Sequence, residues 1–571
     1  MRLPDPYARP GATLRDLLAA AAANERKGIS LYDRRGKNVD RKSWSEVVAF
    51  AARWASWASA RGVRAGDHVM VSLPTSFEFA AAWFGAALLG AKPLALALPR
   101  ALGGEAAFRR RIDGLWKFLE PAWLVGEEWV LELARGSDAA APYAGRIFAF
   151  PDLPPEAQAA PPGVWAEPEA DEVAFLQLTS GSTSFPKAVR IAHRAILANC
   201  RGIGESGGGL FEGDVVVCWL PLNHDMGLVG LFLLALYWGL DLVLLRPETF
   251  LAMPVRWLDA FTRFRGSITA APDFAYRYAV EKVAPEERAG LDLSSWRVAC
   301  TGAETVWEST LDRFVEAYAP FGFRRGSLIP CYGLAEGTLA VTFQEAGRGP
   351  VIREFGPGAF SVAQDAARGR RVVSVGRPLL GMRVEVRGPD GRPLGEGLEG
   401  EVAFAGPCVF SGYHGDPAET TRVMDGEWLL SGDLGVLVEG ELHITGRLKE
   451  ILKVGGQSIG AHEIEYVGQE VIRYADGKSC AFGIVRDGRE LPVLVCEVPA
   501  GDPDRLSEWA SSIRRDVARA FGTQLADLVF VKRGAIPKTT SGKVRRNEVR
   551  DLYRDGKLET VGPPRVLRSG T

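Results

Sequence analysis

The stretch Leu176-Gln-Leu-Thr-Ser-Gly-Ser-Thr-Ser-Phe-Pro-Lys187 is the most informative part of this sequence. An apolar run over residues 173–178 is typical of a buried strand, and it leads into a loop of glycine and small hydroxyl residues. Small side chains let backbone N–H groups approach phosphate oxygens, hydroxyls add donors, and a lysine supplies compensating charge. The stretch therefore predicts a phosphate-binding loop, although the same letters suit an ordinary turn between a strand and the next element.

Apolar runs and amphipathic helical stretches alternate on both sides of this loop. Strands are predicted over residues 68–73, 215–220, 242–245 and 297–300, and helices over residues 13–23, 44–61 and 77–89. This alternation predicts an α/β fold: a large N-terminal domain of mixed, largely parallel sheets with helices. Short strands with glycine and aspartate turns after about residue 372 predict a small β-rich subdomain.

The remaining sequence predicts a second domain. The run Gly446-Arg-Leu-Lys-Glu450 interrupts the alternation of strand and helix candidates. Residues 447–571 then have helix and strand candidates of their own. We therefore expect an N-terminal domain over residues 1–446 and a smaller, mobile α+β domain over residues 447–571.

Composition excludes several classes of protein. With 68 basic and 70 acidic residues the net charge is −2, which argues against a broad nucleic-acid-binding face. The seven cysteines are dispersed without a Cys-x-x-Cys pair, as in a reduced, cytoplasmic protein. The apolar segment 227–245 is interrupted by Gly239 and Asp241, so we predict a buried helix and strand there rather than a membrane span.

Five further motifs follow the phosphate loop. They are Trp219-Leu-Pro-Leu-Asn-His-Asp-Met-Gly-Leu228, Cys331-Tyr-Gly-Leu-Ala-Glu-Gly-Thr338, Ser431-Gly-Asp-Leu-Gly435, Gly446-Arg-Leu-Lys-Glu450 and Pro537-Lys-Thr-Thr-Ser-Gly-Lys-Val-Arg545. In this order and spacing the six motifs resemble those of the adenylate-forming superfamily, across essentially the whole chain. Within it the chain is most similar to the fatty acyl-AMP ligases, on residues 219–228, 256–258 and 271–276 and on an insertion between residues 342 and 375.

The resemblance implies ATP and Mg²⁺ as cofactors and assigns a role to each motif. Phosphate and nucleotide contacts fall on Thr179, Ser180, Gly181, Ser182, Thr183, Lys187, Gly302, Ala303, Glu304, Tyr332, Gly333, Asp433 and Arg447. Among these, Tyr332 would stack on adenine and Asp433 would accept hydrogen bonds from the ribose hydroxyls. Glu336 would hold Mg²⁺, a hard cation that prefers oxygen ligands, together with Thr183.

Two residues are predicted to act on the reacting groups. His224 would lie near the acyl carboxylate, and Lys543 would bridge that carboxylate and the α-phosphate. The C-terminal domain would swing about Lys449 between the two steps. Taken singly, each of these residues also suits a structural role: a turn histidine, a helix acid or a solvated lysine.

The implied reaction converts a carboxylic acid, most similar to a fatty acid, into acyl-AMP with release of pyrophosphate. The acyl group would then pass to the phosphopantetheine thiol of an acyl carrier protein. Two alternatives stay open: a synthetase that uses CoA as acceptor, and a catalytically silent nucleotide- or acyl-binding protein. Retention of Glu336, Asp433, Arg447 and Lys543 together argues against the silent protein.

Overall fold

A computed structural model gives the fold of the chain as two compact units. The first unit comprises residues 1–350, 375–384 and 404–430, and the second comprises residues 351–374, 385–403 and 431–571. The structure describes residues 1–7, 11–33, 39–99, 105–120, 122–137, 139–154, 165–179, 187–355, 370–454, 457–474, 477–486, 489–499, 503–538 and 543–561. The predicted α/β class, with a small α+β C-terminal part, is confirmed. The boundary at residue 446 and the mobility of the C-terminal domain stay predictions.

A nine-stranded sheet forms the largest layer of the first unit, in the order β17-β14-β13-β12-β11-β9-β10-β1-β2. Its centre is parallel, and the strands β14, β17 and β2 add antiparallel edges. The strands are β1 Gly28–Tyr32, β2 Val39–Ser43, β9 Val215–Cys218, β10 Asp241–Leu245, β11 Ile268–Pro272, β12 Val298–Gly302, β13 Leu328–Gly333, β14 Ala340–Phe343 and β17 Arg377–Pro378. Because parallel strands end at one edge, the loops that follow β9, β11, β12 and β13 gather there.

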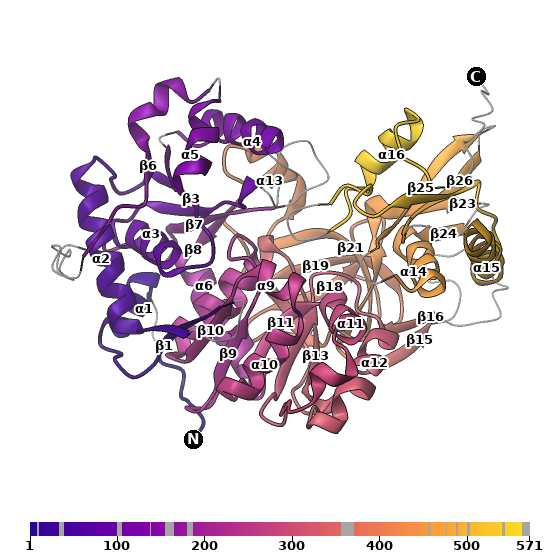
Figure 1. The fold of residues 1–571 in the computed structure, drawn as a ribbon, viewed down its shortest axis with the longest axis horizontal. Coiled ribbons are helices and arrows are strands. Elements are labelled where there is room, and N and C mark those ends of the chain that lie inside the picture. Colours follow the sequence, from indigo (N-terminus) through magenta and orange to yellow (C-terminus); the bar gives the residue numbers. More distant parts are fainter. Residues whose placement is uncertain are drawn as a thin grey trace. The chain divides into compact units, whose positions relative to one another are not determined.

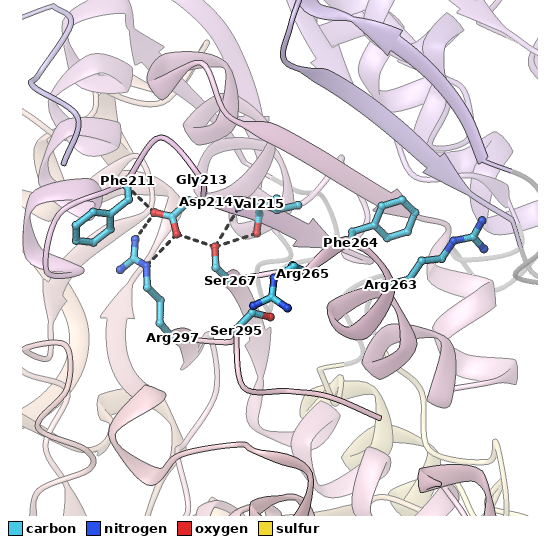
Figure 2. Close-up of a pocket in the computed structure, with 10 residues that line it drawn as sticks. All are labelled: Phe211, Gly213, Asp214, Val215, Arg263, Phe264, Arg265, Ser267, Ser295 and Arg297. Atoms are coloured by element: carbon cyan, nitrogen blue, oxygen red, sulfur yellow. Dashed lines mark hydrogen bonds and ion pairs between the residues drawn. The ribbon is translucent and has the colours of Figure 1, made fainter. Parts of the chain in front are cut away.

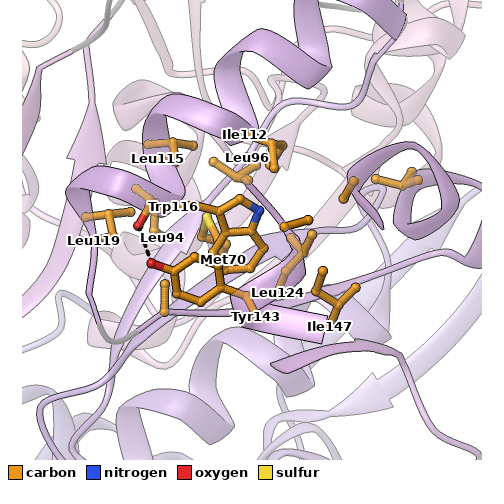
Figure 3. Close-up of a cluster of buried hydrophobic side chains, with 14 of the residues drawn as sticks. Met70, Leu94, Leu96, Ile112, Leu115, Trp116, Leu119, Leu124, Tyr143 and Ile147 are labelled. Atoms are coloured by element: carbon orange, nitrogen blue, oxygen red, sulfur yellow. Dashed lines mark hydrogen bonds between the residues drawn. The ribbon is translucent and has the colours of Figure 1, made fainter. Parts of the chain in front are cut away.

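A second, all-parallel sheet in the order β4-β3-β5-β6 belongs to the same unit. It comprises β3 His68–Ser72, β4 Lys92–Ala95, β5 Ala122–Gly126 and β6 Ile147–Ala149, and the purple part of Figure 1 shows helices α4 (Glu105–Phe118) and α5 (Glu128–Arg135) beside it. Figure 3 shows the core between them, where Trp116 of α4 stacks on Tyr143 with ring centroids 4.6 Å apart. Burial of this apolar surface, at about 25 cal/mol per Å², is the main force holding helix to sheet.

The predicted helices begin and end close to their expected residues. They are α1 Leu14–Ala22, α2 Trp44–Ala60 and α3 Phe77–Leu88. Ser43 and Ser76 start α2 and α3 by accepting the N–H groups of Glu46 and Phe79, as N-cap residues do. The apolar segment near residue 230 forms a π-helical turn (Leu228–Leu233) and helix α8 (Leu234–Trp238) before β10, which confirms the buried helix and strand.

The second unit is built from small sheets. Strands β25 (Ser479–Arg486), β26 (Arg489–Val498) and β27 (Asp527–Lys532) form one sheet, with helices α14 (Ala461–Ile472), α15 (Pro503–Phe521) and α16 (Arg546–Arg554) in the same part of the chain. Strands β15 (Ile352–Phe355) and β16 (Arg370–Val373) pair antiparallel within the predicted insertion. The long strands β21 (Trp428–Val438) and β22 (Glu441–Arg447) pair in the predicted β-rich region.

Candidate active site

The predicted phosphate loop joins two antiparallel strands, β7 (Val173–Leu178) and β8 (Ala188–Ala192). Strand β7 has the predicted bounds. The N–H of Thr179 donates to the carbonyl of Lys187 at 2.9 Å, which closes the base of the loop. Ser180, Gly181, Ser182 and Thr183 lie outside the described residues, so their phosphate and metal roles stay predictions.

Lys187 is held by two side chains that the sequence analysis did not single out. Its ammonium group pairs with the carboxylate of Glu419 and lies 4.7 Å from the centre of the Tyr413 ring. Glu419 also pairs with Arg422, and these two cations hold the pKa of its carboxyl down at about 2. The lysine is therefore fixed beside the loop base by an ionised carboxylate.

Glu336 follows β13 in a short helical turn, Ala335–Gly337. The Tyr413 hydroxyl donates to its Oε1 at 2.7 Å. Burial raises the pKa of Glu336, the Tyr413 hydrogen bond lowers it, and the charges of Asp225 and Lys187 act on it in opposite directions. Glu336, the predicted metal ligand, is therefore close enough to Lys187 and to Asp225 for both of their charges to act on it.

His224 precedes the short helix Asp225–Gly227, beyond the carboxyl end of β9. Its Nδ1 lies 2.8 Å from Oδ1 of Asp225. His224 and Glu336 lie beyond the same edge of the sheet, because β9 and β13 belong to one parallel array and both residues follow the carboxyl ends of their strands.

The predicted nucleotide residues lie at the carboxyl ends of β12 and β13, which are neighbours in the sheet. Tyr332 is buried at the end of β13, next to Gly333. A Cβ at Gly333 would lie 1.7 Å from the carbonyl oxygen of Leu339, so only glycine fits there. The structure therefore brings Tyr332 and Gly333 beside the turn that begins at Gly302.

That turn is strained, and the segment that follows it is hydrogen-bonded to the first residues of helix α11 (Asp273–Lys282). Ala303 has a φ of +64°, a conformation that costs free energy in a residue with a side chain. Oε1 of Glu304 accepts the N–H of Phe274 at 2.7 Å, and the buried Asp273 accepts the N–H of Trp307 at 3.0 Å. Burial raises the pKa of Asp273 to about 7, with Glu304 adding to the effect.

Asp433 and Arg447 face each other across β21 and β22 in the second unit. Nε of Arg447 donates to Oδ1 of Asp433 at 2.6 Å, and the Asp433 side chain is 5% exposed against 52% for Arg447. A buried carboxylate with an exposed guanidinium beside it suits hydrogen bonding to neutral hydroxyl groups and to a phosphate. The structure brings these two predicted residues together.

Lys543 belongs to the second unit and precedes α16. Its neighbour Val544 pairs with Lys538 in an isolated antiparallel bridge. Lys543 therefore lies directly before a segment that pairs back with Lys538, and its predicted role at the α-phosphate stays a prediction.

The oxygen donors of the first unit fit a magnesium ion only with help from the substrate. Among the described residues no group of three or more His, Cys, Asp or Glu side chains could hold a metal. Mg²⁺ is usually bound in nucleotide enzymes through one or two carboxylates plus substrate phosphates. The carboxylate of Glu336 matches that pattern, and ATP would supply the remaining oxygens.

A separate cavity of about 650 Å³ lies at the opposite edge of the large sheet. Figure 2 shows its lining residues, several of which lie at the amino ends of β9, β11 and β12: Asp214 and Val215, Ser267, and Ser295 with Arg297. Arg297 pairs with the buried Asp214, and this pair fastens the amino ends of the strands together. The cavity is therefore distinct from the predicted active-site edge.

Tyr413, Glu419 and Asp225 are the polar residues that the sequence analysis missed at this site. Tyr413 and Glu419 belong to none of the six motifs, and they approach Glu336 and Lys187 only in the folded chain. Asp225 belongs to the motif 219–228, but no role was predicted for it. In the part of the chain that the structure describes, no helix has the length and apolar character to cross a membrane.

Comparison with known proteins gives a consistent result. Residues 18–414 match the model of a family described as AMP-binding enzyme. The chain is 34% identical over 419 residues to the medium-chain-fatty-acid–[acyl-carrier-protein] ligase JamA of Moorena producens, covering 69% of this chain and 70% of that protein. It is 36% identical over 415 residues to a 4-hydroxyphenylalkanoate adenylyltransferase of Mycobacterium marinum, covering 68% and 66%.

Two further comparisons extend over nearly the whole chain. A Caulobacter vibrioides protein provisionally named acyl-CoA synthetase is 32% identical over 557 residues, or 95% of this chain and 96% of that protein. A solved structure from a study of the fatty acyl-adenylate ligases of E. coli and L. pneumophila has a TM-score of 0.86 at 31% identity, covering 97% of this chain and 99% of that one.

Proposed function

Since this chain belongs to the family of AMP-binding, adenylate-forming enzymes, we propose that it activates a fatty acid as acyl-AMP and transfers the acyl group to an acyl carrier protein. The observation that carries this proposal is the neighbourhood of Glu336. The half-buried carboxylate of Glu336, its tyrosine donor and the phosphate-loop lysine come from three distant segments of the chain and meet at one place.

In the first step a carboxylate oxygen of the fatty acid forms a bond to the α-phosphorus of ATP, while the bond to pyrophosphate breaks. The protein mainly positions the reactants and neutralises charge, because no covalent enzyme intermediate is needed. The hydroxyls and N–H groups of the phosphate loop and Lys187 would hold the departing phosphates. Magnesium bound to Glu336 and the triphosphate would neutralise part of their charge.

The nucleoside and the acid would be held by the remaining residues. Tyr332 would stack on adenine, and the buried carboxylate of Asp433 would accept the ribose hydroxyls, with Arg447 at hand for phosphate. Lys543 would supply positive charge between the attacking carboxylate and the α-phosphate. His224 would orient the carboxylate of the acid.

The proposed acceptor rests on two features. The predicted insertion, which contains the paired strands β15 and β16, resembles the insertion of fatty acyl-AMP ligases in its placement along the chain. JamA, which matches two thirds of the chain, is named for transfer to a carrier protein. Transfer to CoA is the second candidate, favoured by the full-length similarity to the Caulobacter protein.

Pyrophosphate exchange with a panel of fatty and aryl acids tests the first half of this proposal. We expect exchange that depends on Mg²⁺ and on one class of fatty acid. A chain that exchanges pyrophosphate with no acid of the panel would be a nucleotide- or acyl-binding protein without catalysis.

The second half is tested by offering CoA and a holo carrier protein side by side to the enzyme loaded with its acid. We expect acyl-carrier product to form faster at equal thiol concentration. Rapid formation of acyl-CoA without any acyl-carrier product would replace the proposed acceptor.

A further inference from the structure

Glu497 is a buried carboxylate that lies outside every motif of the sequence analysis. It belongs to β26, and its side chain is 0% exposed. Its Oε1 accepts the N–H groups of Gly534 at 2.9 Å and Ile536 at 3.0 Å. Its Oε2 accepts the N–H of Lys478 at 2.9 Å and the ammonium group of Lys538 at 3.1 Å. The two oxygens of Glu497 thus accept from four donors on two segments of the chain.

Three of these donors lie on the segment that leads to Lys543. We call residues 533–538 and 543–546 the lysine arm. Its outgoing and returning parts are joined by the bridge between Lys538 and Val544 and by the N–H of Arg545, which donates to the carbonyl of Pro537 at 2.9 Å. Residues 539–542 lie outside the described part of the chain. Glu497 thus fixes the outgoing part of the lysine arm to the central strand of its sheet.

A second buried cluster holds the returning part. Arg546, three residues after Lys543, donates to Oε1 of Glu465 at 2.5 Å and to Oε2 of Glu450 at 3.0 Å. Glu465 lies on α14 and also accepts the N–H of Ala481 at 2.7 Å. The Arg546 and Glu465 side chains are 16% and 11% exposed, so the pair is shielded from water. Glu450 adjoins Lys449, the predicted hinge.

We propose that Glu497 and Arg546 are positioning residues that hold the lysine arm so that Lys543 is presented in a single conformation for adenylate formation. The proposal rests on the proposed role of Lys543. A lysine side chain on an unanchored loop would lose conformational freedom at the moment of reaction, and that cost would appear in the activation barrier. The buried carboxylates of Glu497 on β26 and Glu465 on α14 hold the lysine arm before the reaction begins, so this loss of freedom no longer adds to the barrier. Through Glu450 the same cluster connects the lysine arm to the predicted hinge.

The two half-reactions separate this role from a general effect on folding. Lys543 acts in the first half-reaction, so the Glu497→Gln variant should lose pyrophosphate exchange, about tenfold or more in kcat, with the KM for ATP within about twofold. Gln keeps the shape of the side chain but removes the charge and accepts through one oxygen only. Transfer of the acyl group from added, chemically made acyl-AMP to the thiol should remain unchanged. Full exchange activity in Glu497→Gln, or an equal loss in both half-reactions, would overturn the proposal.

A double variant gives a second readout. If Glu497 acts through Lys543, then Glu497→Gln combined with Lys543→Ala should exchange no more slowly than Lys543→Ala alone. Additive losses would mean that Glu497 acts elsewhere. If Glu497→Gln does not fold, Lys538→Met and Arg546→Lys each remove part of one anchor and should show the same selective loss. Intact exchange in both of those variants would also overturn the proposal.

The matched control is Asp551→Asn, which breaks the pair with Arg554 on the exposed face of α16, close to the lysine arm. Its rate of pyrophosphate exchange should match that of the unchanged enzyme. Lys543→Ala separates the proposed role of Lys543 from the positioning role of Glu497. If it retains exchange, the proposed role of Lys543 fails and the positioning role fails with it. If it loses exchange while Glu497→Gln does not, only the positioning role is wrong.

Discussion

The hydroxyl of Tyr413 connects the side chain of Glu336 with the segment that holds Lys187. It donates to Glu336 at 2.7 Å, and its ring lies against the ammonium group of Lys187. Because burial already raises the pKa of Glu336, loss of this donor in Tyr413→Phe should raise that pKa further. A hydrogen bond to a charged group contributes about 1.5–3 kcal/mol, so we expect the apparent Mg²⁺ requirement of pyrophosphate exchange to rise about tenfold or more.

The sign of the pH dependence provides the check. A carboxyl with a higher pKa loses its charge at higher pH, so the defect of Tyr413→Phe should deepen as the pH falls and shrink in alkaline buffer. Saturating Mg²⁺ should restore most of the rate. A variant whose exchange rate falls equally at every pH and Mg²⁺ concentration would show that Tyr413 serves packing alone.

Residue spacing explains why this tyrosine was not predicted. Tyr413 is 77 positions from Glu336, and Glu419 is 232 positions from Lys187. Motifs in one sequence identify groups that are close along the chain, whereas these partners meet only through the packing of sheets. Glu336, Asp433 and Lys543 could be named from motif order, but the side chains that hold them could not.

At the scale of elements, the contact between α1 and α6 (His193–Ser206) makes a prediction about stability. The N–H of Leu14, the first residue of α1, donates to Nδ1 of the buried His193 at 3.2 Å. An imidazole that accepts at Nδ1 must leave that nitrogen unprotonated, and burial lowers its pKa from 6.5 to about 4. The native state therefore binds fewer protons than the unfolded state in this range.

The contribution of neutral His193 to the free energy of unfolding is fully present above pH 6.5, and it is lost as the pH falls toward 4. The shift corresponds to about 3 kcal/mol at most. In the unchanged protein, the free energy of unfolding measured with urea should decrease as the pH is lowered from 7.5 to 4.5. In His193→Asn, where the amide oxygen takes the place of Nδ1, the stability difference from the unchanged protein should narrow as the pH falls. A difference that stays constant with pH would contradict the assignment.

The elements themselves were largely predictable from local pattern. Strand β7 begins and ends where the apolar run does, and α2 and α3 begin directly after serines that cap them. Local signals suffice there because hydrophobic period and capping chemistry act within a few residues. The antiparallel pairing of β7 with β8 was not predicted, since strand direction depends on where the chain returns.

At the scale of the whole molecule, charge distribution bears on the choice of acceptor. The chain is nearly neutral, yet residues 531–571 hold eleven Lys and Arg against four Asp and Glu, a local charge of +7. Such a basic segment would steer an acidic carrier protein by long-range attraction, which salt screens. We therefore expect the KM for a holo carrier protein to rise about tenfold between low and physiological ionic strength, while pyrophosphate exchange changes less than about twofold.

Reversing one charge distinguishes this steering from a general effect of salt. Arg554 is 69% exposed on α16, and Arg554→Glu should raise the KM for the carrier protein at low ionic strength and leave kcat of transfer nearly unchanged. The same substitution on Arg41, which is exposed in the first unit and contacts Asp241, serves as the control of equal charge change. If the two variants shift the KM equally, or if transfer does not respond to salt, the basic segment does not select the acceptor. A KM for CoA that responds more strongly than that for the carrier protein would instead assign the segment to the phosphates of CoA, because those carry the denser charge.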